Sequence, residues 1–135
     1  NEAVQLLEER PVVVMGGTEP GHTTDAVATR LAIAVKANKC IIATNVEKVF
    51  NEDPRYNPNA KSFDNLTHEE LQEIVGPAEH KEAGKSSVVD PLAVLEATMA
   101  NLELNIIDGR EIERFNNAIL GLDFEGTKIS SEEEK

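Results

Sequence analysis

Residues 11–25 read PVVVMGGTEPGHTTD, and this stretch decides which fold the chain can adopt. Its first part, Pro11 to Met15, is a continuous apolar run, which is typical of a strand covered on both faces. Gly16 to His22 is a loop that contains glycine, and Thr23 or Thr24 can cap a helix that begins there. The stretch therefore predicts a strand, a loop and the start of a helix.

The helix is expected over residues 23–37, because apolar side chains such as Val27 and Leu31 recur at helical spacing. Residues 40–44 form a second apolar run, so a strand–loop–helix–strand unit is predicted. Such units almost always make a right-handed parallel crossover. Cys40 lies in this second run and is expected to be a small, buried core residue. Because it is the only cysteine, an intrachain disulfide is excluded.

The remainder of the chain continues the alternation of strands and helices. Residues 45–65 are rich in Asn, Asp and Pro, and we expect a loop with a short hairpin there. Further helices are expected at residues 2–9 and from the capping box Thr67-His68-Glu69-Glu70 to Val75. Another is expected after the cap Asp90-Pro91, with one apolar stripe formed by Leu92, Leu95, Met99 and Leu102. A last helix is expected across Ile112, Phe115 and Ile119. Further strands are expected at Leu104–Ile107 and Thr127–Ser130. This alternation implies an α/β layered fold with a mostly parallel sheet.

Length and charge limit the class of protein. The 135 residues suffice for one compact domain, expected over residues 1–130, with an acidic tail at residues 131–135. The net charge of −12 argues against a general nucleic-acid binder, because affinity for the phosphate backbone comes from clustered Lys and Arg. No apolar stretch reaches the roughly 20 residues of a membrane helix, and no segment reads as a secretory signal. We therefore expect a cytoplasmic protein that binds neither nucleic acid nor membranes.

Two loops are the candidate ligand sites, because ligands of such sheets bind outside the carboxyl ends of the strands. The first, residues 16–24, combines glycines, the free N–H groups of a helix start and two threonine hydroxyls, which together suit an anion. A plain turn with a threonine cap explains the same residues equally well. The loop is neither a Walker A loop nor a Rossmann fingerprint.

Two side chains of this first loop have alternative interpretations. Asp25 either complements the dipole of its own helix or organises cationic groups beside a bound phosphate. His22 is more simply a loop residue that touches a ligand than a metal ligand, because no partner residues lie near it in the sequence.

The second loop follows the second strand. Thr44 and Asn45 offer donors and acceptors for a nucleobase edge or a phosphate, and Phe50 offers a flat face. Asp53 could accept hydrogen bonds from a ribose, but a turn before Pro54 is the favoured interpretation. In a third segment Lys81 or Lys85 could reach a phosphate, although solvated lysines are the simpler explanation, and Asp90 is expected to be only an N-cap.

These segments resemble one known family in the right order. Residues 16–26 resemble the UMP-binding loop of archaeal UMP kinases, which belong to the amino-acid-kinase superfamily. Residues 44–46, together with Phe50 and residues 53–54, are similar to the ATP loop of that family. Residues 83–93 resemble a stretch near the triphosphate, and residues 125–127 resemble its closing Gly-Thr. The likeness runs from about residue 11 to residue 129 and corresponds to the C-terminal part of the family.

The resemblance implies a three-layer αβα sandwich, the amino-acid-kinase fold in incomplete form, and phosphoryl transfer from ATP to UMP in pyrimidine nucleotide biosynthesis. It implies that Asp25 is catalytic and that Mg²⁺ accompanies ATP. The UMP site would comprise Gly17, Thr18, Glu19, Pro20, Gly21, His22, Thr23 and Thr24. The ATP site would comprise Thr44, Asn45, Phe50 and Asp53. The full-length protein would form a homo-oligomer, a hexamer.

Two departures from the family pattern leave alternatives open. The family usually has Asp-Gly-Val-Tyr where this chain has Glu47-Lys48-Val49-Phe50, and Lys48 adopts a positive φ less easily than glycine. Nothing here corresponds to the N-terminal portion of the family, so we expect a fragment or one half of a split protein that is inactive alone. Another superfamily kinase that acts on a carboxylate or carbamate, or a nucleotide-binding module without activity, remains an alternative.

Overall fold

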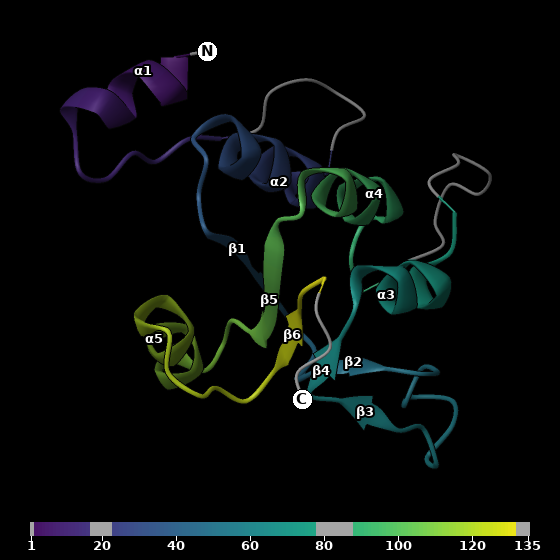
Figure 1. Cartoon of the computed structure of the whole chain (residues 1–135). Helices are drawn as coiled ribbons and strands as arrows, with labels where there is room; N and C mark the ends of the chain where they lie inside the picture. The colour runs from purple at the N-terminus through teal and green to yellow at the C-terminus, as the bar shows by residue number, and fades with distance from the viewer. Residues whose placement is uncertain (1, 17–22, 78–87, 132–135) are drawn as a thin grey trace.

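The computed structural model describes residues 2–16, 23–77 and 88–131 (Figure 1). Its helices are α1 (Glu2–Glu9), α2 (Thr24–Ala34), α3 (His68–Val75), α4 (Pro91–Ala100) and α5 (Ile112–Leu120). Its strands are β1 (Lys39–Thr44), β2 (Val49–Phe50), β3 (Ser62–Phe63), β4 (Asn65–Leu66), β5 (Glu103–Asp108) and β6 (Thr127–Ile129). Apart from the first strand, every helix and strand expected from the sequence is confirmed, within a few residues at its ends.

The main sheet is mostly parallel, as the sequence predicts. Within the described residues it has four strands in the order β1-β5-β6-β4. The pairs β1–β5 and β4–β6 are parallel, and β5–β6 is antiparallel. The short hairpin expected between residues 45 and 65 is also present, because β2 pairs with β3 in antiparallel register.

Helices cover both faces of this sheet and make three layers (Figure 1). The helices α2, α3 and α4 lie on one face, and α5 lies on the other. Strand β5 shows the division most clearly. Leu104 and Ile106 pack into the core under α4, whereas Ile107 points to the opposite face, where Ala118 of α5 is also fully buried. The αβα layering implied by the resemblance is confirmed.

The predicted strand at Pro11–Met15 is wrong for the described structure. This segment has no strand pairing, and the side chains of Val12 and Val14 are 75% and 91% exposed. A run of valines reports a preference for burial, but a strand also needs a neighbouring strand to hydrogen-bond with. In the described residues β1 is the outer strand of the sheet, and the parallel connection runs from β1 to β5.

The buried face of α4 also differs from the predicted stripe. Met99 is 80% exposed and Leu95 is exposed, whereas Ala93, Val94 and Ala97 are fully buried. Helix α4 is packed between α2 and α3, and small side chains allow these helices to approach closely. Leu95 and Met99 are more hydrophobic than the alanines, but Ala93 and Ala97 are the residues buried where α4 packs between α2 and α3.

The helix caps predicted from the sequence are confirmed. Thr67 and Glu70 form both hydrogen bonds of the capping box at the start of α3. Thr23 accepts a hydrogen bond from the α2 backbone, and Asp90 does the same for α4, with Pro91 at the first helical position. Cys40 is buried, as expected.

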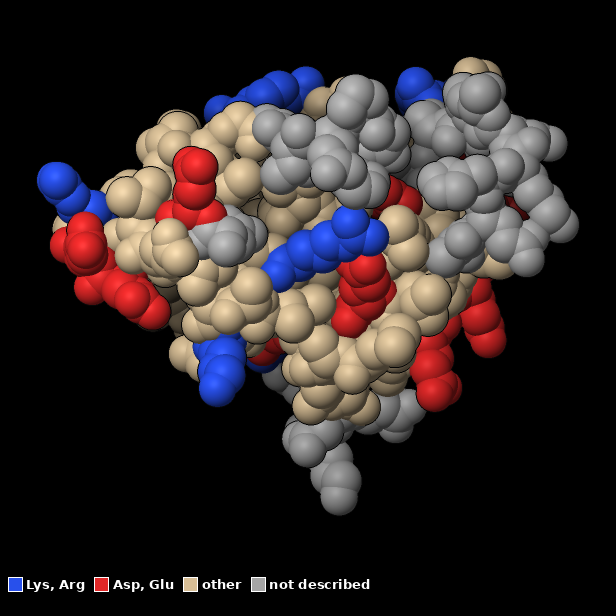
Figure 2. Space-filling view, turned by 90° about the horizontal axis from the view of Figure 1, so that it is seen from above, with Lys and Arg blue, Asp and Glu red and all other residues tan. Residues whose placement is uncertain are grey.

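The surface formed by α2 and α4 is seen from above in Figure 2. On this view the basic side chains of the described residues are scattered rather than gathered in one patch. Arg30 of α2 forms an ion pair with Glu96 of α4, with 2.9 Å between Nη2 and Oε1. None of the helices in the described ranges is long and apolar enough to cross a membrane.

Candidate functional site

The topology brings two helix starts towards the same edge of the sheet. Helix α2 leads directly into β1, and α4 leads directly into β5. A helix that packs antiparallel on the strand it precedes directs its N-terminus towards the carboxyl end of that strand. Because β1 and β5 are parallel, with Thr44 opposite Asp108, both helix N-termini approach one edge. This is the edge where ligands of parallel sheets usually bind.

Hydrogen bonds tie the two helix starts together. The hydroxyl of Thr23 donates to Asp90 Oδ2 at 2.5 Å and accepts from the Ala26 N–H at 3.2 Å. The other oxygen of Asp90 accepts from the Leu92 N–H at 2.9 Å. In return, the backbone N–H of Asp90 donates to Asp25 Oδ2 at 3.0 Å. The first turns of α2 and α4 therefore form one connected unit.

Asp25 is held within this unit and is not a freely solvated acid. Burial raises the pKa of Asp25 above its ordinary value, the hydrogen bond from the Asp90 backbone lowers it, and the charge of Asp90 raises it further. The partial positive charge of a helix N-terminus favours an anion nearby. A carboxylate in this position can attract and orient cationic groups beside a bound phosphate, which is the second of the two interpretations of Asp25.

The two threonines at the start of α2 differ in what they can offer a ligand. The hydroxyl hydrogen of Thr23 is taken by Asp90, so Thr23 has only its backbone N–H left to donate. Thr24 is exposed, and its hydroxyl makes no hydrogen bond within the described residues. The remaining residues predicted to contact UMP lie outside the described residues: Gly17, Thr18, Glu19, Pro20, Gly21 and His22.

The second predicted loop begins where β1 ends. Thr44 is the last residue of β1, and Asn45 follows it on the surface. Phe50 lies in β2 and is half-buried. The turn interpretation of Asp53 is confirmed, because its carboxylate accepts from the Arg55 N–H at 2.9 Å and from the Arg55 side chain at 2.8 Å. A contact between Asp53 and a ribose stays a prediction, and it would compete with Arg55.

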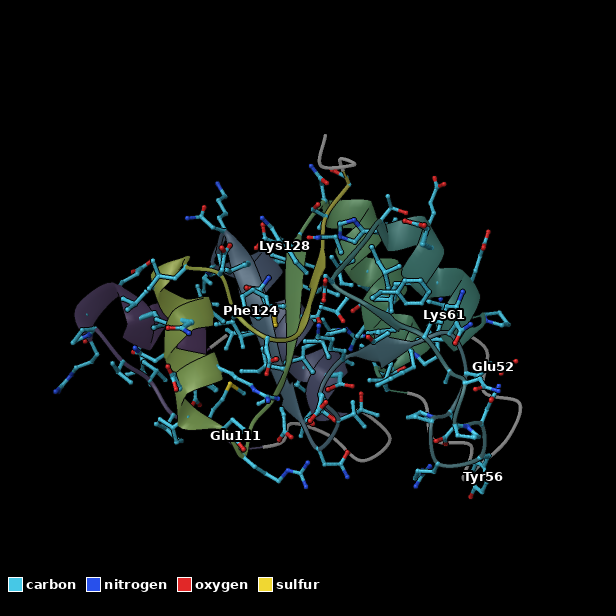
Figure 3. All side chains as sticks on the ribbon, turned by 90° about the horizontal axis from the view of Figure 1, so that it is seen from below. Glu52, Tyr56, Lys61, Glu111, Phe124 and Lys128 are labelled. Carbon is cyan, nitrogen blue, oxygen red and sulfur yellow. The ribbon has the colours of Figure 1, made fainter. Side chains whose placement is uncertain are left out.

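The hairpin that carries Phe50 is fastened to the main sheet by one buried hydroxyl. Thr127 of β6 donates to the carbonyl of Phe63 at 2.6 Å and accepts from the N–H of Val49 at 2.9 Å. Lys48 forms an ion pair with Asp64 beside this contact. Figure 3 shows the loop beyond β2, with Glu52 and Tyr56 labelled, projecting from one side of the molecule.

The lysine at position 48, where the resemblance predicts glycine, does not require a positive φ. Within the described ranges, the residues other than glycine with positive φ are Lys36 and Asn101. Lys48 is not one of them, so the lysine at this position is not held in the left-handed region.

Sequence reasoning missed one group of residues at the same edge, Asp108-Gly109-Arg110. The side chain of Asp108 is 6% exposed and forms an ion pair with Arg110, with 2.7 Å between Oδ2 and Nη2. The Arg110 side-chain bond, followed by its backbone N–H, lowers the pKa of Asp108 to about 2. Arg110 also donates to the carbonyl of Asn45 at 3.1 Å. A signal existed, because these residues directly follow a buried strand.

The described residues contain no group of three or more His, Cys, Asp or Glu side chains that could hold a metal ion.

Comparisons with known proteins identify the family. The model of the Amino acid kinase family matches residues 1–108. The chain is 41% identical over 128 residues to the uridylate kinase of Pyrococcus abyssi, covering 95% of this chain and 56% of that protein. It is 47% identical over 110 residues to the uridylate kinase of Methanococcoides burtonii, covering 82% and 47%.

A solved structure agrees with the sequence matches. The crystal structure of uridylate kinase from Archaeoglobus fulgidus superposes with a TM-score of 0.82 at 39% identity, covering 96% of this chain and 56% of that one. The chain thus spans about half the length of the curated relatives that it matches. With the family model matching most of its length, this chain belongs to the amino acid kinase family.

Proposed function

We propose that this chain takes part in the transfer of the γ-phosphoryl group of ATP to UMP, giving ADP and UDP in pyrimidine nucleotide biosynthesis. The joined N-termini of α2 and α4 are the observation that supports this function most directly. At the start of α2 the N–H groups of Thr24 and Asp25 donate to no acceptor within the described residues, and they provide positive potential for a phosphate in a protein of net charge −12. The similarity to relatives named uridylate kinase supports UMP as the acceptor.

The acceptor side of the reaction belongs to the start of α2. The backbone N–H groups of Thr23 and Thr24, the Thr24 hydroxyl and residues 17–22 would line the UMP phosphate. Asp25 would orient the charged groups around the phosphoryl group in transit. Phosphoryl transfer needs mainly positioning and the neutralisation of developing charge, and a loop followed by a helix N-terminus supplies both.

The donor side belongs to the loop after β1. Thr44 and Asn45 would contact ATP, and Phe50 would stack on the adenine, for which its missing hydroxyl is no loss. Asp53 would exchange its bond to Arg55 for the ribose hydroxyls. Mg²⁺ would enter with ATP and balance the charge of the phosphates. A hexameric assembly and a cytoplasmic location are further parts of this proposal.

A panel of acceptors tests the function. The full-length protein is incubated with Mg²⁺, labelled ATP and, separately, UMP, CMP, aspartate and carbamate, and the labelled products are quantified. Preferential labelling of UMP supports the proposal. Preferential labelling of a carboxylate or carbamate would assign the protein to another branch of the family. ATP binding in calorimetry with no labelled product from any acceptor would identify a nucleotide-binding module without activity.

A further inference from the structure

Two hydrogen bonds join the chain at the carboxyl ends of β1 and β5, one that continues the strand pairing and one from a side chain. The Gly109 N–H donates to the carbonyl of Thr44 at 2.9 Å, and the Arg110 guanidinium donates to the carbonyl of Asn45 at 3.1 Å. Two consecutive carbonyls of the predicted ATP loop are therefore held by two consecutive residues at the end of β5. No other described side chain bonds to the Asn45 backbone.

Asp108 fixes the guanidinium that makes the second of these bonds. Asp108 Oδ1 accepts from the Arg110 N–H at 3.0 Å and from Nε at 2.9 Å, and Oδ2 accepts from Nη2 at 2.7 Å. A planar guanidinium held at two points keeps one orientation, because its N–H groups form a rigid fork. The Asp108 side chain is 6% exposed and the Arg110 side chain is 69% exposed, so the buried carboxylate anchors a guanidinium that lies on the surface.

The glycine between them allows the close contact. A Cβ atom on Gly109 would lie 2.8 Å from the Cβ of Ala43 and 3.6 Å from the Ala43 backbone. Only a residue without a side chain lets β5 approach the end of β1 so closely. The three residues thus work together: Gly109 permits the approach, Asp108 orients the guanidinium and Arg110 reaches across to Asn45.

These bonds also decide where the amides of the loop point. In a planar trans peptide the carbonyl and the following N–H point in opposite directions. Because the carbonyls of Thr44 and Asn45 face β5, the N–H groups of Asn45 and Val46 face away from β5. The orientation of the loop amides is therefore set by a side chain that belongs to a different strand.

We propose that Asp108 and Arg110 are a positioning pair that holds the Thr44–Asn45 loop in the conformation that binds the nucleotide donor. The assignment of that loop to ATP rests on the proposed function. The pair acts through the Asn45 backbone, so its loss weakens ATP binding and leaves UMP binding, which belongs to the start of α2, unchanged.

Kinetic measurements on the full-length protein test this. Arg110→Gln should raise KM for ATP about tenfold, the scale of one hydrogen bond to a charged group, with KM for UMP within twofold. Asp108→Asn should have a similar effect, and the double variant should be no worse than either, because the two residues act as a unit. Arg30→Gln is the matched control, since it breaks an Arg–Glu pair on the α2–α4 surface and should change neither KM.

Arg110→Lys separates positioning from charge. Lysine keeps the positive charge but cannot bind Asp108 through two nitrogens and Asn45 at once, so it should behave like Arg110→Gln. Wild-type KM values in Arg110→Lys would show that charge suffices and would overturn the proposal, as would equal losses for ATP and UMP.

A readout that needs no turnover keeps this test separate from the proposed function. The Nε–H of Arg110 should give a slowly exchanging NMR signal that Asp108→Asn abolishes, and calorimetry should give the ATP affinity of each variant. If the wild type binds ATP but does not phosphorylate UMP, the proposed function fails while the positioning pair remains testable. If UMP is phosphorylated and the Arg110 variants bind ATP normally, only the positioning pair fails.

Discussion

Replacing Thr127 by valine removes the hydroxyl that fastens the β2–β3 hairpin to the main sheet. Valine has nearly the same shape, so it leaves no cavity, but it can neither donate to the Phe63 carbonyl nor accept from the Val49 N–H. Each unsatisfied buried group costs about 1–2 kcal/mol. We therefore expect Thr127→Val to lower the free energy of unfolding by about 2–4 kcal/mol, a large part of the roughly 5–15 kcal/mol of a typical domain.

Urea unfolding of the wild type and the variants measures this change directly. Thr127→Ser is the matched control, because serine keeps both hydrogen bonds and loses only one methyl group, worth about 1 kcal/mol. The order of stability should be wild type, then serine, then valine. A valine variant more stable than the serine variant would refute the reasoning, since packing and not hydrogen bonding would then hold the hairpin.

Three further perturbations follow from the described contacts. Asp25→Asn should leave the fold intact, because an amide oxygen can still accept from the Asp90 N–H, while turnover of UMP falls by ~10² or more in a steady-state assay; unchanged turnover would reject the catalytic role. Thr24→Ala should weaken UMP binding by about 1 kcal/mol in calorimetry. Thr23→Ala should weaken UMP binding and also lower the melting temperature, since it loses a helix cap worth about 1 kcal/mol. Equal melting temperatures for the two variants would contradict the capping geometry. Asp108 has a pKa lowered to about 2 from an ordinary 3.8, so its ionised form stabilises the fold above pH 4 and this stabilisation is lost as the pH falls towards 2. The free energy of unfolding of Asp108→Asn should therefore fall less steeply than that of the wild type over this pH interval. Identical pH profiles for the two proteins would exclude the Asp108–Arg110 pair as a source of stability.

Features encoded by neighbouring residues could be predicted from the sequence. The capping box Thr67–Glu70 and the Asp90-Pro91 cap depend on residues within one helical turn, and both are present as expected. The alternation of apolar runs with helical periodicity was likewise enough to predict the layered α/β fold.

Features that depend on distant partners could not be predicted. The valines of Pro11–Met15 have the composition of a strand, but nothing in that run specifies the strand that would pair with it. Arg110 gains its importance from Asn45, 65 residues earlier in the chain, and Asp25 is held by Asp90 at the same separation. Because the partners of each pair lie far apart in the chain, no local sequence pattern links them.

The buried face of α4 illustrates a third limit. Hydrophobicity ranked Leu95 and Met99 above Ala93 and Ala97, yet the alanines are buried because α4 is packed between two other helices. The size of the space available, and not the hydrophobicity of the side chain alone, decides which residues face inward.

Binding of the UMP phosphate at the start of α2 is the claim on which the proposed function depends. Backbone NMR of the full-length protein, titrated with UMP and separately with uridine, measures it most directly. We predict that UMP shifts the amide signals of Thr23, Thr24 and Asp25 strongly and that uridine, which lacks the phosphate, leaves them nearly unchanged. Saturating binding of UMP with no change in these three amides would contradict the account.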